Sequence, residues 1–288
     1  MQLRKLFTTM AAGCLVLASS MALAAPKDDL TAALNRMKDP VGTYNIEMKI
    51  PFAHLDTLTS HVKLDLQTSP YVAHAVITTT MGKQSPSVTE LYEIQEGNQI
   101  KTYNQELLHS GDKTKSWVYS YSPAAKGSIS DSLEPESLLG SVSAVQSVSN
   151  AGGVEHLKVT FDSNKLFSDW GIKHTVEQTA KSDPKTDKDF EEQFEKLRKS
   201  GPMYGDVYII NGRMSKFEAD ISKPVKAFET VIKHGVSRKS HTGALGNWIL
   251  GMILKTNKST MTLNCGALTH SVSIPQSVIN AAVPEPKK

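Results

Sequence analysis

The residues of this chain that could do acid–base, nucleophilic or metal chemistry are scattered along it. The nine histidines occur singly, without the paired spacing of a metal site. The chain contains no Gly-x-Ser-x-Gly elbow, no Gly-x-x-x-x-Gly-Lys phosphate loop and no His-Glu-x-x-His motif. The sequence therefore predicts no catalytic residue, no metal and no cofactor, and it favours a binding protein over an enzyme.

One pair of carboxylates keeps a catalytic alternative open. Glu134 and Glu136 flank Pro135 in a predicted loop, and inverting hydrolases use paired acids on either side of a sugar. Acids beside the start of a helix are more commonly stabilised there by the helix dipole. A hydrolase therefore remains the less favoured alternative.

An apolar segment near the C-terminus points to a different chemistry. From Gly243 to Leu254 the chain carries no charge, but this is too short for a membrane span, which needs about 20 residues. As a helix, the segment would bury one broad apolar face. That face consists of Leu245, Trp248, Ile249, Met252 and Ile253. We expect these residues to form either a core helix or a mobile plug that lines an apolar ligand cavity.

A second, highly charged helix is predicted over 183–201. Asp183-Pro184 begins it, Gly201-Pro202 ends it, and its acids precede its bases, as the helix dipole favours. Its narrow apolar stripe consists of Phe190, Phe194 and Leu197. We expect this stripe to act as a lid over the same cavity.

The N-terminus resembles a secretory signal peptide. Arg4 and Lys5 precede a long apolar run, which ends in small residues at 22–24. We expect cleavage after residues 1–24 and export to the periplasm or cell envelope. Lipidation at Cys14 is the minority alternative.

Charge and cysteine content narrow the range of partners. The chain holds 32 Lys and Arg against 29 Asp and Glu, and cleavage would remove two basic residues, which leaves a net charge close to zero. A nucleic-acid partner is therefore not expected, and neither is tight electrostatic docking to anionic lipid. Peripheral membrane contact stays open, and we expect a monomer. Cys265 would be the one cysteine of the mature chain, and we expect it to be buried.

Alternation of apolar and polar residues indicates strands through most of the chain. In residues 43–50, for example, Tyr44, Ile46 and Met48 fall on one side. Asn211-Gly212 is the preferred pair for a type I′ hairpin turn. Similar strand patterns occur in 61–68, 71–80, 116–122, 156–163, 171–179 and 258–265. Helices are expected at 28–37, 134–150 and 183–201.

These elements predict a mainly β, α+β protein with one strongly curved antiparallel sheet and a few helices on its concave side. Twist accumulates across a long sheet, so we expect it to curl into a barrel or an open half-barrel. We assign one domain to 25–282 and a flexible tail to 283–288.

The order of these segments resembles a known family. A signal peptide, a short helix, "VGTYNIEMKI", long hairpins, "VYIINGRMSKFEADIS" and a closing "SIPQSVINAA" are similar to the lipoprotein-carrier-like proteins of bacterial envelopes, of the LolA/LppX type. The resemblance implies an open half-barrel whose helices plug an apolar concavity for acyl chains, with no catalytic residues. The charged helix over 183–201 and the apolar segment 243–254 depart from the family pattern.

The expected function is therefore non-enzymatic binding of a lipid or an acylated protein, in transit across the envelope. Two alternatives remain. One is an envelope module that binds another protein and no small ligand, and the other is a hydrolase acting on an envelope polymer.

Overall fold

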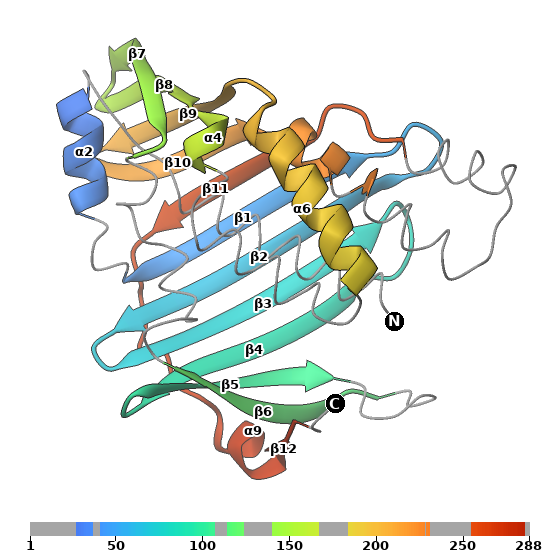
Figure 1. Ribbon diagram of the computed structural model, residues 1–288. Helices are drawn as coiled ribbons and strands as arrows, with labels where there is room; N and C mark the ends of the chain where they lie inside the picture. The colour runs from blue at the N-terminus through green and yellow to red at the C-terminus, as the bar shows by residue number, and fades with distance from the viewer. Residues whose placement is uncertain are drawn as a thin grey trace, which may run out of the picture.

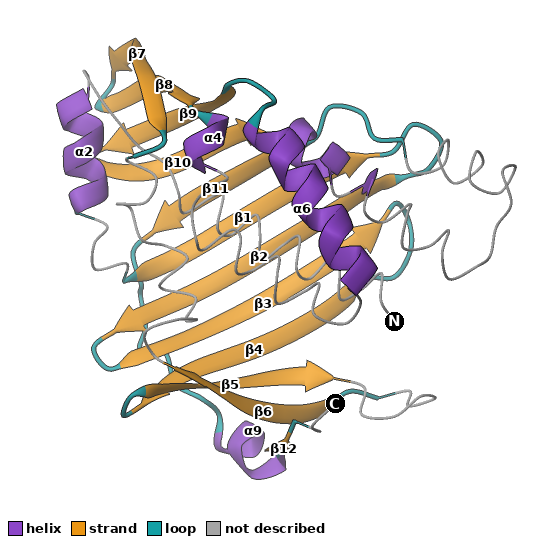
Figure 2. Ribbon diagram, viewed as in Figure 1, coloured by secondary structure: helices purple, strands orange, loops and turns teal. Residues whose placement is uncertain are grey.

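The computed structural model describes residues 27–36, 41–106, 114–123, 140–166, 184–227, 229–230 and 255–285. These residues form one large sheet with helices on both of its sides and at one end (Figures 1 and 2). The predicted signal peptide and the apolar segment 243–254 lie outside the described residues. The mainly β, antiparallel fold that the sequence predicts is confirmed.

The sheet contains twelve strands. They are β1 (Gly42–Pro51), β2 (Thr57–Thr68), β3 (Tyr71–Met81), β4 (Ser87–Glu96), β5 (Gln99–Glu106), β6 (Ser116–Pro123), β7 (Val142–Ala151), β8 (Val154–Phe161), β9 (Met203–Ile210), β10 (Arg213–Asp220), β11 (Thr260–Gly266) and β12 (Val283–Pro284). The helices are α2 (Lys27–Asn35), α4 (Ser163–Leu166), α6 (Pro184–Arg198) and α9 (Gln276–Ala281). Residues 222–227 form a further helical segment after β10.

The strand order is β12-β6-β5-β4-β3-β2-β1-β11-β10-β9-β8-β7. Each neighbouring pair is antiparallel except β12 and β6, which run parallel. The edge strands β12 and β7 do not pair with each other, so the sheet is not closed into a barrel. Strands β5 and β6 run at a visible angle to β1–β4 (Figure 1).

The sheet has one apolar face and one polar face. On β1, Tyr44, Ile46 and Met48 are buried on the apolar face, whereas Asn45 and Lys49 on the polar face are exposed. Burying such a side chain stabilises the fold by roughly 1.5–3 kcal/mol. Because side chains alternate along a strand, pairing in register keeps the same face apolar from one strand to the next.

The C-terminal segment covers the polar face at the β4–β6 end of the sheet. Val278 of α9 packs there against Tyr92 and Tyr103. After α9, β12 pairs with β6, and the Glu285 amide donates to the Tyr119 carbonyl oxygen. The sequence assigns 283–288 to a flexible tail. Within that range, Val283 and Pro284 form β12, because the outer edge of β6 offers unpaired backbone groups to them.

Between β11 and α9 the chain forms a connection, residues 267–275, which is fixed to the polar face by polar contacts. Asp65, on β2, has a side chain that is only 2% exposed. It accepts a hydrogen bond from the Thr43 hydroxyl at 2.6 Å, pairs with Lys63 at 3.0 Å, and lies 3.7 Å from His270 of the connection. Burial alone would raise the pKa of Asp65, but the hydrogen bonds and the two cations outweigh it and hold that pKa below its usual range.

The structure corrects the predicted helix over 134–150. Residues 142–151 form strand β7, which pairs antiparallel with β8 through a turn at Gly152 and Gly153, both at positive φ. Apolar residues at 142 and 145 fit one helical face, but 142–151 is rich in valine and serine, and pairing with β8 decides the outcome. Residues 134–139 lie outside the described part.

The β9–β10 turn has the predicted type I′ chemistry. Asn211 and Gly212 adopt φ values of 52° and 70°, as this turn requires. Arg36, just after α2, donates from Nη1 to the Asn211 carbonyl oxygen at 3.0 Å. A Cβ at Gly212 would lie 2.0 Å from that Nη1. The turn therefore also fixes the position of α2 at this end of the sheet (Figure 1).

We predict that Gly212→Ala lowers the free energy of unfolding by about 2 kcal/mol, from the positive φ and from displacement of Arg36. Gly97→Ala is the matched control, because Gly97 has φ 63° and no atom near its added Cβ; it should cost only about 1 kcal/mol. Chemical denaturation measures both. Equal losses would show that the Arg36 contact contributes nothing.

A second prediction concerns pH. Asp65→Asn should destabilise the protein by about 1–3 kcal/mol at pH 7, because the stabilising charged hydrogen bonds are lost. The folded pKa of Asp65 is depressed, so this stabilisation is complete above the unfolded pKa of about 4 and disappears as pH falls through the folded pKa. Urea unfolding from pH 7 to pH 3 should show the two proteins converging in acid.

Candidate ligand-binding face

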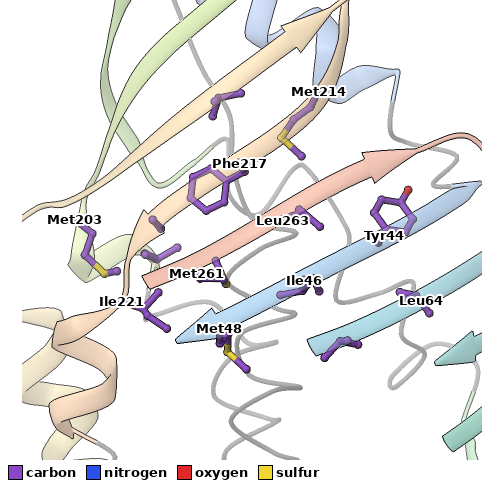
Figure 3. Packing of buried hydrophobic residues seen from close by; sticks show 14 of the residues in the cluster. Tyr44, Ile46, Met48, Leu64, Met203, Met214, Phe217, Ile221, Met261 and Leu263 are labelled. Carbon is purple, nitrogen blue, oxygen red and sulfur yellow. The ribbon is translucent and has the colours of Figure 1, made fainter. Parts of the chain in front are cut away.

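The apolar face is continuous across the middle of the sheet. Figure 3 shows side chains from β9, β10, β11, β1 and β2 meeting on one side. Phe217 of β10 lies opposite Leu263 of β11, which in turn lies opposite Ile46 of β1. The fully buried members of this cluster with the largest side chains are Phe161, Phe217, Leu30, Leu34, Leu64, Leu66, Leu157, Ile221, Met261, Leu263 and Val62.

A hollow opens on this face between α4 and strands β8–β11. It is a small depression of about 10 Å³, partly open to solvent, which is about the room that one water molecule needs. Its lining consists of Phe161, Leu166, Met203, Tyr204, Ala219, Ile221 and Met261. This volume is far below the 300–1,000 Å³ of typical ligand sites. A long apolar ligand would therefore need additional space, which a covering element would have to provide by moving.

Helix α6 lies across the strands on this side (Figure 1). Leu197 is buried in the apolar cluster, and Phe194 packs against it half-buried. The side chain of Phe190, the third member of the predicted lid stripe, lies outside the described residues. The outward positions of the helix carry charge, with Glu192 pairing with Lys196 at 2.7 Å. Among the described side chains of this helix, the apolar ones that contact the cluster are those of Phe194 and Leu197.

The loop that follows the C-terminal end of α6 is held by hydrogen bonds. The Lys223 ammonium donates to the carbonyl oxygens of Ser200, Gly201 and Pro202 at 2.7, 3.2 and 2.8 Å. The Ser163 hydroxyl also donates to the Gly201 carbonyl oxygen. Gly201 has φ 76°, a conformation that favours glycine. If α6 moves, these contacts make the loop after it the fixed end.

The predicted plug residues Leu245, Trp248, Ile249, Met252 and Ile253 lie outside the described residues, and their role stays a prediction. The residues on either side of their segment are described. Thr256 donates from its amide and its hydroxyl to Glu229 Oε2 at 3.3 and 3.1 Å, and the Lys255 carbonyl accepts from the Ala53 amide at 2.7 Å. The described residues before and after the predicted plug segment therefore lie at one place, beside the end of β1.

The apolar face becomes more polar toward β4. Glu93 is 5% exposed and accepts a hydrogen bond from the Tyr71 hydroxyl at 2.6 Å. On β5, Asn104 Oδ1 is buried without a hydrogen-bond partner. Sequence reasoning missed both residues, because a single polar residue in an alternating strand is normally exposed. The sequence contains one indication that Glu93 is buried. Glu93 lies two residues from Leu91 and therefore on the same side of its strand, which in the structure is the apolar face.

Two similar side-chain groups lie on the polar face, and the sequence did not predict them. His74 stacks on Tyr92 and contacts Glu90 at 2.8 Å. On the other half of the sheet, His156 stacks on Tyr208 and contacts Asp206 at 2.8 Å. In each group the carboxylate holds one imidazole nitrogen and a tyrosine ring covers one side. The arrangement links two neighbouring strands.

The aromatic residues of β6 also lie on the polar face. Trp117 and Tyr119 belong to the cluster beneath α9, while Tyr121 is exposed. Lys101 Nζ lies 4.7 Å from the Tyr119 ring centroid, within cation–π range. Hydrogen bonding with Tyr121 is the main reason that the pKa of Lys101 is raised. These rings therefore stabilise the sheet and lie away from the apolar face.

The sequence leaves one carboxylate pair open as a catalytic alternative. Glu134 and Glu136 lie outside the described residues. Cys265 packs beside the apolar cluster, and burial raises the pKa of its thiol to about 12, so the reactive thiolate is scarce at neutral pH. Within the described ranges, no three His, Cys, Asp or Glu side chains converge as a metal site.

No family model and no curated protein matches this chain. Among the described residues, no helix combines the length and apolar character needed to cross a bilayer.

The contacts of Lys223 generate a prediction about α6. Lys223→Met should lower the free energy of unfolding by about 1–3 kcal/mol, and it should increase amide hydrogen exchange at the C-terminal turn of α6. Lys226→Met is the control, because Lys226 is an exposed lysine in the same helical segment. Equal exchange in the two variants would mean that Lys223 does not hold α6.

Proposed function

We propose that this protein binds an acyl chain of a lipid or of a lipid-modified protein, without catalysis. In this proposal the open sheet is curved as a half-barrel and the apolar face is its inner, concave side. The continuous apolar face with its apolar hollow is the observation that carries the proposal. Burial of an acyl chain contributes roughly 0.8 kcal/mol per methylene, so one chain needs no ion pair to be held.

Helix α6 is the proposed lid, with Phe190, Phe194 and Leu197 as its apolar stripe. The hollow has room for about one water molecule, so a ligand requires α6 to move. Among the described side chains of α6, Phe194 and Leu197 contact the apolar cluster, and Lys223 holds the loop after the helix. Displacing it exchanges apolar contacts with protein for apolar contacts with ligand. The predicted signal peptide supports a site of action in the periplasm or cell envelope, where lipids and acylated proteins are in transit.

The test is lipid extraction and mass spectrometry of the mature protein purified from its native envelope. Ala219→Phe should fill the hollow and reduce bound lipid several-fold, because the added ring occupies the ligand's volume. Thr262→Phe is the matched control, since residue 262 lies on the neighbouring strand with its side chain on the polar face. A third variant, with Trp248→Asp and Ile253→Asp, tests the predicted plug.

Stoichiometric lipid in the wild type and in Thr262→Phe, but not in a folded Ala219→Phe, is the expected result. A wild type without lipid would overturn the proposal and leave the protein–protein module as the better explanation. Circular dichroism and melting curves show whether each variant is folded.

A further inference from the structure

We infer that strand β7 pairs with β7 of a second copy of this chain, antiparallel and about a two-fold axis, so that two sheets join into one. This inference does not depend on the proposed lipid ligand. The sequence favours a monomer, and the edge of the sheet at β7 is the structural feature that points to a dimer instead. The backbone, the charge and the opposite edge of the sheet each contribute to the argument.

Strand β7 is one of the two edge strands of the sheet, at the end opposite β12 (Figure 1). It is ten residues long and pairs with β8 on one side. No described strand pairs with its other side, so the backbone N–H and C=O groups along that side can accept a further strand. From 146 to 151 every residue is exposed, although side chains alternate between the two faces of a strand. This half of the edge is therefore accessible from both faces of the sheet.

The composition of β7 leaves this edge poorly protected. Folded proteins commonly block an edge strand with a charged residue or a proline, and β7, with the sequence VSAVQSVSNA, contains neither. Its protection consists of two register shifts against β8, which bend the strand. The remaining backbone groups of the edge keep their capacity to pair with another extended chain.

The absence of charge favours a second copy as the partner. In a two-fold pair each strand lies against its own sequence, so a strand of one charge sign would repel itself. The nearest charged residues in the sequence are Glu136 and Glu155, and none lies between them. Strand β7 can therefore pair with itself without bringing like charges together.

The side chains of β7 fix the orientation of the pair. Val145 packs against the apolar cluster and lies opposite Val159 of β8, so it marks the apolar face at this edge. An antiparallel neighbour, related by a two-fold axis perpendicular to the sheet, has its apolar face on the same side. The apolar faces of the two copies would then form one continuous surface. Val148, which is 49% exposed, would lose contact with water in this pair.

The opposite edge of the sheet explains why association should stop at two copies. Strand β12 consists of Val283 and Pro284, and the proline has no backbone N–H to donate to a further strand. Pairing of β7 with β12 of another copy would build an open chain of molecules, and this short edge disfavours it. A pair of β7 strands uses the long edge of both copies and is closed.

Sedimentation velocity of the mature protein over a range of concentrations tests this inference. One strand pair is a small interface, so we expect a monomer–dimer equilibrium in the micromolar range or weaker, without larger species. Added salt should change it little, because the edge carries no charge. Gln146→Lys with Val148→Lys should raise the dissociation constant at least about tenfold, since it puts like charges on both strands. The matched control is His54→Lys with Leu55→Lys, in the exposed connection between β1 and β2, which should leave the equilibrium unchanged.

Cross-linking identifies the surface that pairs. A two-fold axis brings residues near the middle of β7 close to their own copies. Cysteines introduced one at a time as Gln146→Cys, Ser147→Cys and Val148→Cys should therefore include at least one that links two chains on mild oxidation. Asn45→Cys, an exposed position on the polar face of β1, should not.

Three results would overturn the inference: a wild type that stays monomeric at every concentration, a dimer that persists unchanged in the folded lysine variant, or a dimer that none of the β7 cysteines links. Assembly beyond two copies would also overturn it, because a β7–β7 pair is closed. Circular dichroism and melting curves show whether each variant is folded. Lipid extraction is a separate measurement, so failure of the dimer leaves the proposed function standing.

Discussion

The alternation of side chains along each strand is the constraint on which the rest of this structure depends. It puts every second residue of β1, β2, β9, β10 and β11 on one side, and in-register pairing joins these into a single apolar face. A sheet that is open at both edges has no interior of its own, so something must cover such a face. The helices, the connections and the proposed ligand are all candidates for that cover.

The two sides of the sheet are covered by different kinds of contact. On the polar face, the C-terminal segment is held by Asp65, by the aromatic cluster beneath α9 and by backbone pairing of β12 with β6. These contacts are directional, and a different molecule could not easily replace them. On the apolar face, α6 is attached by apolar packing, which is non-directional and which an acyl chain can reproduce. In the proposed function, the exchangeable cover is therefore the one on the apolar side.

Much of this fold could be predicted from the sequence, because its strongest signals are local. Alternation in residues 43–50 and the Asn211-Gly212 pair each require only a few neighbouring residues, and β1 and the β9–β10 turn follow from them. Strand β7 was missed because valines three residues apart fit a helix as well as an irregular edge strand. Glu93 and Asn104 were missed because their burial depends on strands far away in sequence. Residues 283–285 were missed for the same reason, since only the distant strand β6 orders them.

If the protein carries a lipid as proposed, it must release this ligand as well as bind it. If α6 and an acyl chain compete for the same apolar face, most of the burial energy of the chain is offset by the contacts that the helix loses. The net affinity then depends on what the helix does not provide. One buried acceptor on this face, Asn104 Oδ1, has no hydrogen-bond partner in the described part of the chain. In the proposed function, a ligand that donated a hydrogen bond to this acceptor would gain affinity that α6 cannot match. The apolar face itself could be covered by the helix or by an acyl chain.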